Sequence, residues 1–167
     1  MRNVAALIVF ALLLQSALGQ AAKEWIRFAP PNGGFVIMMP DKPKEDMDVK
    51  DGFTTHLFTV SAGQAVYLVG FGDYGPSVKL DPQKELEANR DNFNKGLNAT
   101  LQTSTQYNID GRMGLEFTSE TTNATLKSRV FIVGNRVIQL ATLVSKNSNE
   151  KLNVDKFLDS FAFTTKN

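Results

Sequence analysis

The sequence of 167 residues contains no cysteine. Disulfides, thiolate metal ligands and a cysteine nucleophile are therefore excluded, and the fold has to be held together by its core alone. Histidine is almost absent as well, because His56 is the sole example. A histidine-based metal site would need further ligands at suitable spacing, so the only metal site that stays open is an oxygen-rich one.

Long apolar runs are missing, apart from one near the start of the chain. Residues 1–3 form a short basic segment, residues 4–14 form an apolar run, and residues 15–22 are small or polar. This is the three-part pattern of a signal peptide. The apolar run is shorter than the roughly 20 residues that cross a bilayer. We therefore expect a signal peptide over 1–19, with cleavage as late as residue 21, and an exported protein that is soluble in the periplasm or outside the cell.

The same region argues against a lipid anchor. A bacterial lipoprotein needs a cysteine at the cleavage point, and Gln20 stands there instead. The rest of the sequence has no second apolar segment of membrane-spanning length. The mature form is expected to be neither a lipoprotein nor a transmembrane protein.

An excess of charge of one sign is also absent, because Lys and Arg total 18 and Asp and Glu total 17. Removal of Arg2 with the signal peptide leaves the mature chain close to neutral. No long-range field is then available to attract nucleic acid or anionic lipid, so nucleic acid is not an expected partner. Residues 22–167 are enough for a single domain with a real core and too few for two ordinary ones.

What the sequence does contain is a series of short segments rich in β-branched and aromatic residues, separated by turn residues. Pro-Asn-Gly, Ser-Ala-Gly, Asp-Gly and Gly-Asn sequences predict tight turns between these segments. The predicted hairpins pair 25–28 with 35–39, 53–60 with 64–71, 101–109 with 112–118, and 126–133 with 136–144. Because residues 64–71 are apolar on both faces, they predict a central strand that is covered on both sides.

Two helices are predicted among the hairpins. The first begins at Asp81, an N-cap residue that is followed by Pro82 at the first helical position. Its apolar stripe of Leu86, Phe93 and Leu97 is narrow, which predicts a helix on the surface of a sheet. The second helix spans 148–158 and is expected to direct five residues toward the core: Leu152, Val154, Phe157, Leu158 and Phe161. The whole pattern predicts one α+β domain with a largely antiparallel sheet built from hairpins.

Residues 40–52, between the first two hairpins, carry two prolines and many charges. The acidic residues are dense enough for a calcium loop, but lysines are interleaved with them and the spacing of an EF-hand is not met. These acidic residues are Asp41, Glu45, Asp46, Asp48 and Asp51. We interpret the segment as a solvated loop, and we expect no metal there.

Three motifs extend over nearly the whole predicted mature chain: Phe28-x-x-Pro31 before Gly-Phe-Val-Ile at 34–37 and Pro40, the closing hairpin at 131–140, and Lys-Phe-Leu-Asp-Ser-Phe at 156–161. Together they resemble the small exported PsbP-like proteins of bacteria. The resemblance implies an antiparallel sheet with helices packed on its faces, an α/β/α sandwich. It also implies a non-catalytic accessory or assembly factor without a cofactor, and it brings no catalytic residues with it.

The stretch VGFGDYGP, residues 69–76, contains the pattern G-x-G-x-x-G of dinucleotide-binding loops. Such a loop turns from a strand directly into a helix whose N-terminal amides hold a phosphate. Here residues 76–80 intervene, and Asp81 would place a carboxylate where the phosphate belongs. We therefore interpret Gly72 and Gly75 as turn residues with backbone angles that other residues resist, and nucleotide binding is less favoured.

Two other functions remain open. His56 could serve a hydrolase as a general base, although the sequence shows neither a nucleophile nor an orienting acid for it. The aromatic residues on the predicted strands could instead line the site of a carrier for a small apolar ligand. These aromatic residues are Phe53, Phe58, Tyr67, Phe71, Phe117 and Phe131.

The function that we favour is a non-enzymatic domain that binds an envelope protein or complex as an accessory or assembly factor. The export signal, the lack of a catalytic motif and the PsbP-like resemblance all support it. Asp73, Tyr74 and Pro76 lie on a predicted exposed turn between buried elements, where contact residues are often found. We expect these three residues to contact the partner.

Overall fold

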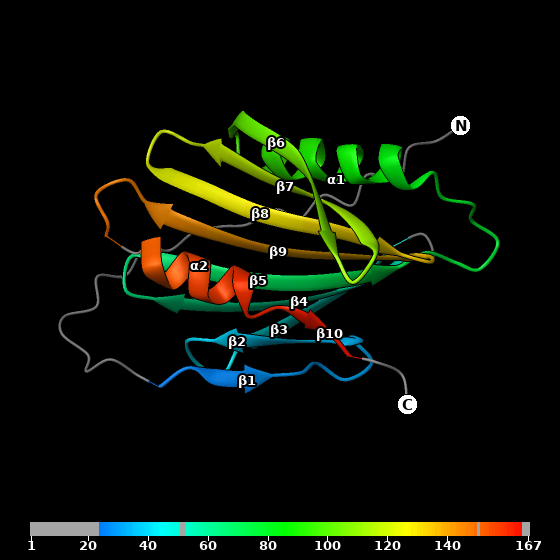
Figure 1. Ribbon diagram of the computed structural model, residues 1–167, viewed down its shortest axis with the longest axis horizontal. Helices are drawn as coiled ribbons and strands as arrows, with labels where there is room; N and C mark the ends of the chain where they lie inside the picture. Colours follow the sequence, from blue (N-terminus) through cyan, green and yellow to red (C-terminus); the bar gives the residue numbers. More distant parts are fainter. Residues whose placement is uncertain (1–23, 51–52, 150, 165–167) are drawn as a thin grey trace.

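The computed structural model describes residues 24–50, 53–149 and 151–164. The predicted signal peptide with its cleavage site, and Asp51, lie outside the described residues. Two β-sheets and two helices make up the described part (Figure 1). All described strand pairs are antiparallel, as the sequence predicts.

The larger sheet has seven strands in the order β3-β4-β5-β9-β8-β7-β6. Their bounds are β3 Lys44–Lys50, β4 Phe53–Ala62, β5 Ala65–Asp73, β6 Thr100–Ile109, β7 Arg112–Glu120, β8 Ala124–Val133 and β9 Arg136–Ser145. The hairpins β4–β5, β6–β7 and β8–β9 confirm the three hairpins that were predicted after the first one. Strand β5 is buried from Ala65 through Gly72, which confirms that it is covered on both faces.

One face of the larger sheet is covered by a smaller sheet and by helix α2 (Figure 1). The smaller sheet consists of β1 (Ile26–Phe28), β2 (Phe35–Met39) and β10 (Ala162–Phe163), in the order β1-β2-β10. The first predicted hairpin is therefore present, but it pairs with the C-terminal strand instead of joining the larger sheet. A two-residue strand such as β10 is too short to show a periodic pattern in the sequence.

Helix α2 (Lys151–Asp159) buries Val154, Phe157 and Leu158 against this face. The expectation that Leu152 also points to the core is wrong, because Leu152 is 84% exposed. A helix of nine residues turns only one stripe toward a sheet, and Leu152 precedes Val154 by two positions, so it lies on another side of the helix.

The opposite face of the larger sheet carries helix α1 (Pro82–Gly96), which packs on β7 and β8. The Asp81 side chain caps the helix by accepting a hydrogen bond from the backbone N–H of Lys84 at 3.3 Å. Leu86 is fully buried, and Phe93 and Leu97 pack on the apolar clusters of this face. The predicted α+β fold with helices on both faces is thus confirmed.

The interpretation of residues 40–52 as a loop is wrong for residues 44–50, which form the edge strand β3 and pair with β4 over their whole length. Every residue of β3 is exposed. An edge strand that is solvated on both faces needs no apolar residues, so charged side chains are compatible with backbone pairing there. The pattern of charges therefore concealed the strand.

Candidate functional site

The predicted contact residues lie where β5 ends and the chain continues through residues 74–81 to α1. Asp73, the last residue of β5, is opposite Arg136, the first residue of β9. The guanidinium of Arg136 donates two hydrogen bonds to this carboxylate, from Nε to Oδ1 at 2.7 Å and from Nη2 to Oδ2 at 2.6 Å. Such paired, charge-assisted bonds fix both side chains in one orientation.

Arg136 also connects this corner of the larger sheet to the turn between β1 and β2. Its Nη1 donates to the backbone oxygens of Asn32 and Gly33, and its guanidinium lies 4.6 Å from the centre of the Phe71 ring. Asp73 is therefore held in a contact within the protein. A partner that contacts Asp73, as predicted, would meet a side chain that is already bonded to Arg136.

Tyr74 is half-buried and is held at three points. Its hydroxyl donates to the carboxylate of Glu85 on α1, its backbone N–H donates to the oxygen of Asn135 at 2.9 Å, and its ring packs on Phe53 with 4.5 Å between the centroids. Burial, together with the hydrogen bond and the charge of Glu85, raises the pKa of Tyr74. The phenol therefore stays protonated and acts as a donor that ties the loop to α1.

The β8–β9 turn holds the rest of the loop. The side-chain amide of Asn135 donates to the backbone oxygens of Gly75 and Val78, both at 3.0 Å. The N–H of Val78 also donates to the oxygen of Gly75 at 3.0 Å, which closes a tight turn. The two bonds of Asn135 connect residues about 60 positions apart in the sequence, so the conformation of the loop depends on the tertiary structure.

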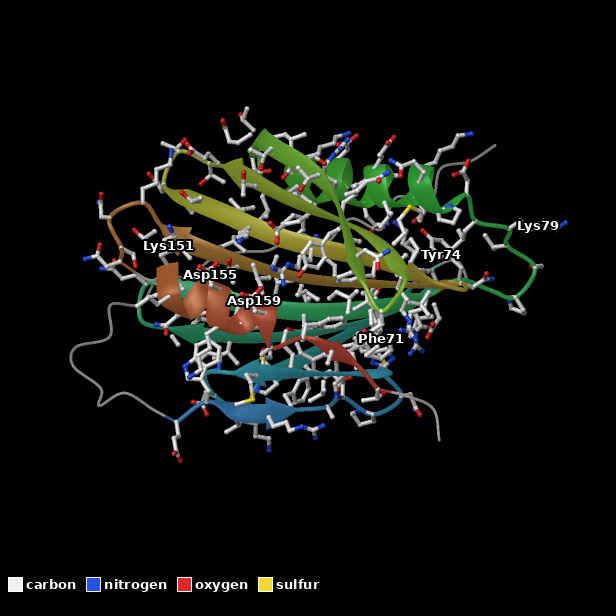
Figure 2. All side chains as sticks on the ribbon, in the orientation of Figure 1. Phe71, Tyr74, Lys79, Lys151, Asp155 and Asp159 are labelled. Carbon is white, nitrogen blue, oxygen red and sulfur yellow. The ribbon has the colours of Figure 1, made fainter. Side chains whose placement is uncertain are left out.

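The tip of the loop, residues 76–79, is exposed at every position. We call Pro76, Ser77, Val78 and Lys79 the loop tip. Figure 2 shows Lys79 extending away from the sheet, whereas Tyr74 lies close to it. Of the three predicted contact residues, the structure places Pro76 on the accessible tip, and it uses Asp73 and Tyr74 to support that tip. Sequence reasoning did not single out Val78 and Lys79, although both follow directly after Pro76-Ser77.

The interpretation of Gly72 and Gly75 as residues with unusual backbone angles is wrong, because neither has a positive φ. Gly72 is needed for space instead. A Cβ there would lie 2.3 Å from Cζ of Phe53. No atom lies within 4 Å of a Cβ placed on Gly75.

The surroundings of these glycines differ from those of a dinucleotide site. Residues 74–81 separate β5 from α1, and the carboxylate of Asp81 occupies the helix N-terminus. Strands β5 and β6, which flank α1 in the sequence, are separated in the sheet by β9, β8 and β7. A dinucleotide site needs two adjacent parallel strands at this point, so the glycine pattern has no structural support for such a role.

His56 has an acidic neighbour that the sequence did not reveal. Its Nδ1 lies 2.9 Å from Oε1 of Glu45 on β3, and its ring stacks on Phe71 with 4.7 Å between the centroids. The charged sequence of residues 40–52 conceals this neighbour, because it indicates a loop where β3 pairs with β4. The described contacts of His56 are thus a carboxylate and a phenyl ring, and no hydroxyl that an imidazole base could activate as a nucleophile is among them. Within the described ranges, no group of three or more His, Asp or Glu side chains is arranged to hold a metal ion.

The six aromatic residues considered for an apolar ligand lie on opposite faces of the larger sheet. Phe58, Tyr67, Phe71 and Phe131 belong to the cluster under α2 and the smaller sheet. Phe117 belongs to the cluster under α1, and Phe53 packs on Tyr74 beside the same cluster. The rings therefore do not converge on a common site, and their neighbours are other side chains of the protein.

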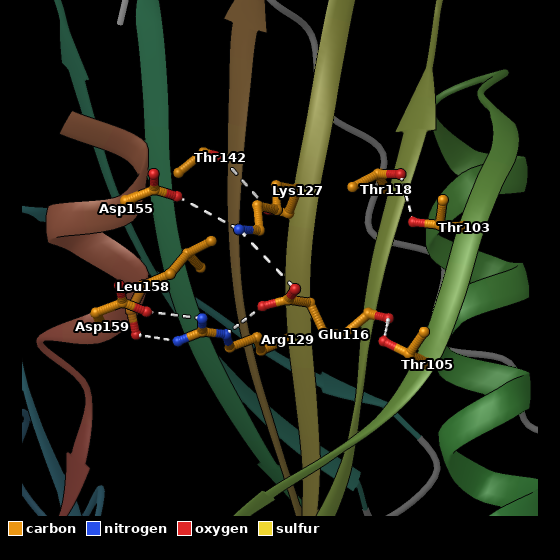
Figure 3. Close-up of polar contacts among 10 residues, drawn as sticks. All are labelled: Thr103, Thr105, Glu116, Thr118, Lys127, Arg129, Thr142, Asp155, Leu158 and Asp159. Carbon is orange, nitrogen blue, oxygen red and sulfur yellow. Dashed lines mark hydrogen bonds and ion pairs between the residues drawn. The ribbon is translucent and has the colours of Figure 1, made fainter. Parts of the chain in front are cut away.

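A polar cluster lies on the open part of the sheet beside α2 (Figure 3). Arg129, whose side chain is only 6% exposed, donates to Glu116, to the backbone oxygen of Leu158 and to Asp159, each at 2.7 Å. Burial alone would lower the pKa of Arg129, but the hydrogen bonds to the two carboxylates raise it. Because Arg129 binds the last residues of α2, we assign this cluster a structural role.

Comparison with protein-family models and with curated proteins gives no match. Among solved structures, the chain is similar to cyanobacterial PsbP (CyanoP) from Synechocystis sp. PCC 6803, with 14% identity, a TM-score of 0.60, and coverage of 90% of this chain and 98% of that one. It also matches a crystal structure from Bacteroides thetaiotaomicron VPI-5482 with 13% identity and a TM-score of 0.46, over 84% of this chain and 48% of that one. In the described part of the chain, no helix has the length and apolar character that crossing a membrane requires.

Proposed function

From the PsbP-like fold of this chain and the exposed loop between β5 and α1, we propose a non-catalytic accessory or assembly factor that binds an envelope protein or complex through the loop tip. The observation that carries the proposal is the fixed conformation of an exposed loop. Asn135 and Tyr74 hold the loop from both ends while residues 76–79 stay accessible. A loop that is ordered before binding loses less conformational entropy when it meets a partner.

The chemistry of the loop tip suggests the kind of surface that it meets. Pro76 restricts the backbone, Val78 is a 40% exposed apolar side chain, and Lys79 adds a positive charge. A shallow apolar depression with an acidic rim would accept this combination, because interfaces typically place apolar contacts centrally and charges at the rim. We propose this surface for the partner.

Neither alternative function has comparable support. The exposed His56–Glu45 pair has the acid and base of a hydrolase site, but no hydroxyl nucleophile is among its described contacts. A carrier would need apolar side chains that face an open space, and the six aromatic residues pack on other side chains in clusters on opposite faces.

The experiment is affinity capture from envelope extract with the tagged protein and two charge-reversed variants. The test variant is Val78→Asp with Lys79→Glu on the loop tip. The matched control is Leu152→Asp with Lys151→Glu on α2, because it makes the same changes at another exposed apolar and lysine pair. Mass spectrometry of the captured bait should also show a chain that begins at Gln20 or Ala22, as expected for a mature domain over 22–167 in the periplasm or outside the cell.

The expected result is a reproducible partner that the wild type and the control retain and that the loop-tip variant loses. If the wild type captures no reproducible partner at low stringency, the accessory function is refuted. If the loop-tip variant keeps every partner, another surface makes the contact.

A further inference from the structure

The two edges of the larger sheet differ sharply in charge. Edge strand β3, with the sequence KEDMDVK, has five charged residues among its seven. Edge strand β6, with the sequence TLQTSTQYNI, has none among its ten. Each strand pairs on one side only within the described chain, β3 with β4 and β6 with β7. An unpaired strand edge offers backbone donors and acceptors to another chain, and charged side chains are one means of preventing that pairing.

The charges of β3 oppose its pairing with a second copy of itself. In the two-fold antiparallel arrangement that pairs all seven residues, Met47 lies opposite its own copy. Lys44 then lies opposite Lys50, and Asp46 lies opposite Asp48. Like charges directly opposite one another destabilise an antiparallel pair. The charges therefore oppose the full-length pairing of β3 with its own copy.

Strand β6 has no charged residues that would oppose pairing, and its protection is limited to the register shift between Leu101 and Thr103. Residues 100–106 are exposed without exception, and no register of β6 against its own copy brings charges of the strand itself together. A charge of another element does lie beside the strand, because the Arg90 guanidinium on α1 donates to Oγ of Ser104 at 3.0 Å.

The residues of β6 are also suited to pairing, as the inner side of the strand shows. Thr103 and Thr118 of β7 share a hydrogen bond between their hydroxyls at 2.6 Å (Figure 3). Cross-strand Thr–Thr contacts of this kind stabilise antiparallel pairs.

The other end of β6 is anchored to the core, which keeps the free edge ordered. The Tyr107 ring lies 6.1 Å from the Phe131 ring, and the Arg129 guanidinium lies 4.2 Å from the centre of the Tyr107 ring. The register of β6 shifts between Leu101 and Thr103, so the regular exposed ladder begins at Thr103. The edge open to another strand is thus short but fixed in place.

We propose that β6 is an interface at which two copies of this chain pair antiparallel, so that their larger sheets join into one. In the same sheet, edge strand β3 carries charges that oppose pairing and edge strand β6 carries none, which points to pairing at β6. Self-complementarity without opposed charges points to a second copy as the occupant. Because the regular exposed ladder is short, the dimer is weak and depends on concentration. This proposal is independent of the loop tip and of the partner proposed above.

The test measures the molar mass of the purified protein by sedimentation equilibrium at concentrations up to about 1 mM, a range in which weak dimers assemble. The edge variant is Gln102→Lys with Gln106→Lys on β6. The matched control is Met47→Lys with Val49→Lys on β3, where both wild-type side chains are more than 60% exposed. Circular dichroism of each variant checks that the fold is retained.

We expect the wild type and the β3 control to approach twice the chain mass, and we expect the β6 variant to dissociate with a Kd raised by about tenfold or more. Amide hydrogen exchange on the wild type gives a second measurement that needs no variant. Protection of the amides between Thr103 and Gln106 should rise with protein concentration. A wild type that stays monomeric, or a dimer that withstands the β6 lysines, would overturn the proposal.

Discussion

Alanine at Gly72 is expected to displace the rings that support the candidate contact loop. A Cβ at this position would lie 2.3, 2.8 and 3.0 Å from Cζ, Cε1 and Cε2 of Phe53. The Phe53 ring in turn packs on Tyr74, with 4.5 Å between the centroids. These separations are too short for carbon atoms, so the Phe53 ring has to move away from the sheet and disturb its contact with Tyr74. Because the clashing atoms are the far end of a partly exposed side chain that can shift, the cost should lie near the lower end of the about 1–3 kcal/mol that overpacking a core causes.

Gly75→Ala is the matched control from the same glycine pattern. No atom lies within 4 Å of a Cβ on Gly75, and its φ is not positive. Alanine there restricts the unfolded chain and creates no clash, so the unfolding free energy should stay the same or rise by about 0.4–1 kcal/mol.

The assay is urea unfolding of the wild type, of both single variants and of a double variant that combines Gly72→Ala with Phe53→Leu. Because the smaller leucine leaves room for the added methyl group, the double variant should be more stable than the sum of its two single changes predicts. If Gly72→Ala and Gly75→Ala destabilise equally, backbone angles and not the Phe53 ring explain these glycines, and the reasoning from space is refuted.

Two further predictions concern Arg129 and Tyr74. Arg129→Met should lower the unfolding free energy by about 2 kcal/mol, since it leaves the buried backbone oxygen of Leu158 and the partly buried carboxylate of Glu116 without their donor. Lys127→Met removes ion pairs of a more exposed side chain and should cost no more than about 1 kcal/mol. Equal losses in urea unfolding would contradict the structural role of Arg129. The raised pKa of Tyr74 means that the folded protein keeps a phenolic proton that the unfolded chain releases near pH 10. The contribution of Tyr74 to the unfolding free energy is therefore complete below about pH 10 and declines as the pH rises above it. The decline in unfolding free energy between pH 9 and pH 11 should therefore be smaller in Tyr74→Phe than in the wild type, and an identical decline would show that Tyr74 does not cause it.

The sequence predicted elements whose signals are local. Asp81-Pro82 marked the start of α1, and Asp110-Gly111 marked the turn between β6 and β7, where both residues have positive φ, 51° and 76°. It failed for β3, where solvation of both faces removes the alternation of apolar and polar residues. It also failed for Leu152, because helix periodicity alone does not say which side of a short helix meets the sheet.

The sequence predicted the position of the candidate site but not the role of each of its residues. The position of Asp73, Tyr74 and Pro76 between a buried strand and a helix was enough to locate the loop. The partners of its first two residues, Arg136 and Glu85, lie 63 and 11 positions further along the chain. No pattern in the sequence connects these pairs, so the division between supporting residues and the accessible tip could not be predicted.

By itself, the sequence determined the absence of disulfides, three hairpins of the larger sheet, the start of α1 and the two-sided burial of β5, because each follows from composition or from neighbours within a few residues. Only the tertiary structure decided that β1 and β2 form a second sheet with β10, that Phe53 lies over Gly72 and that Asn135 holds the β5–α1 loop. These features depend on contacts between distant segments, and such contacts form only when the hydrophobic faces pack together.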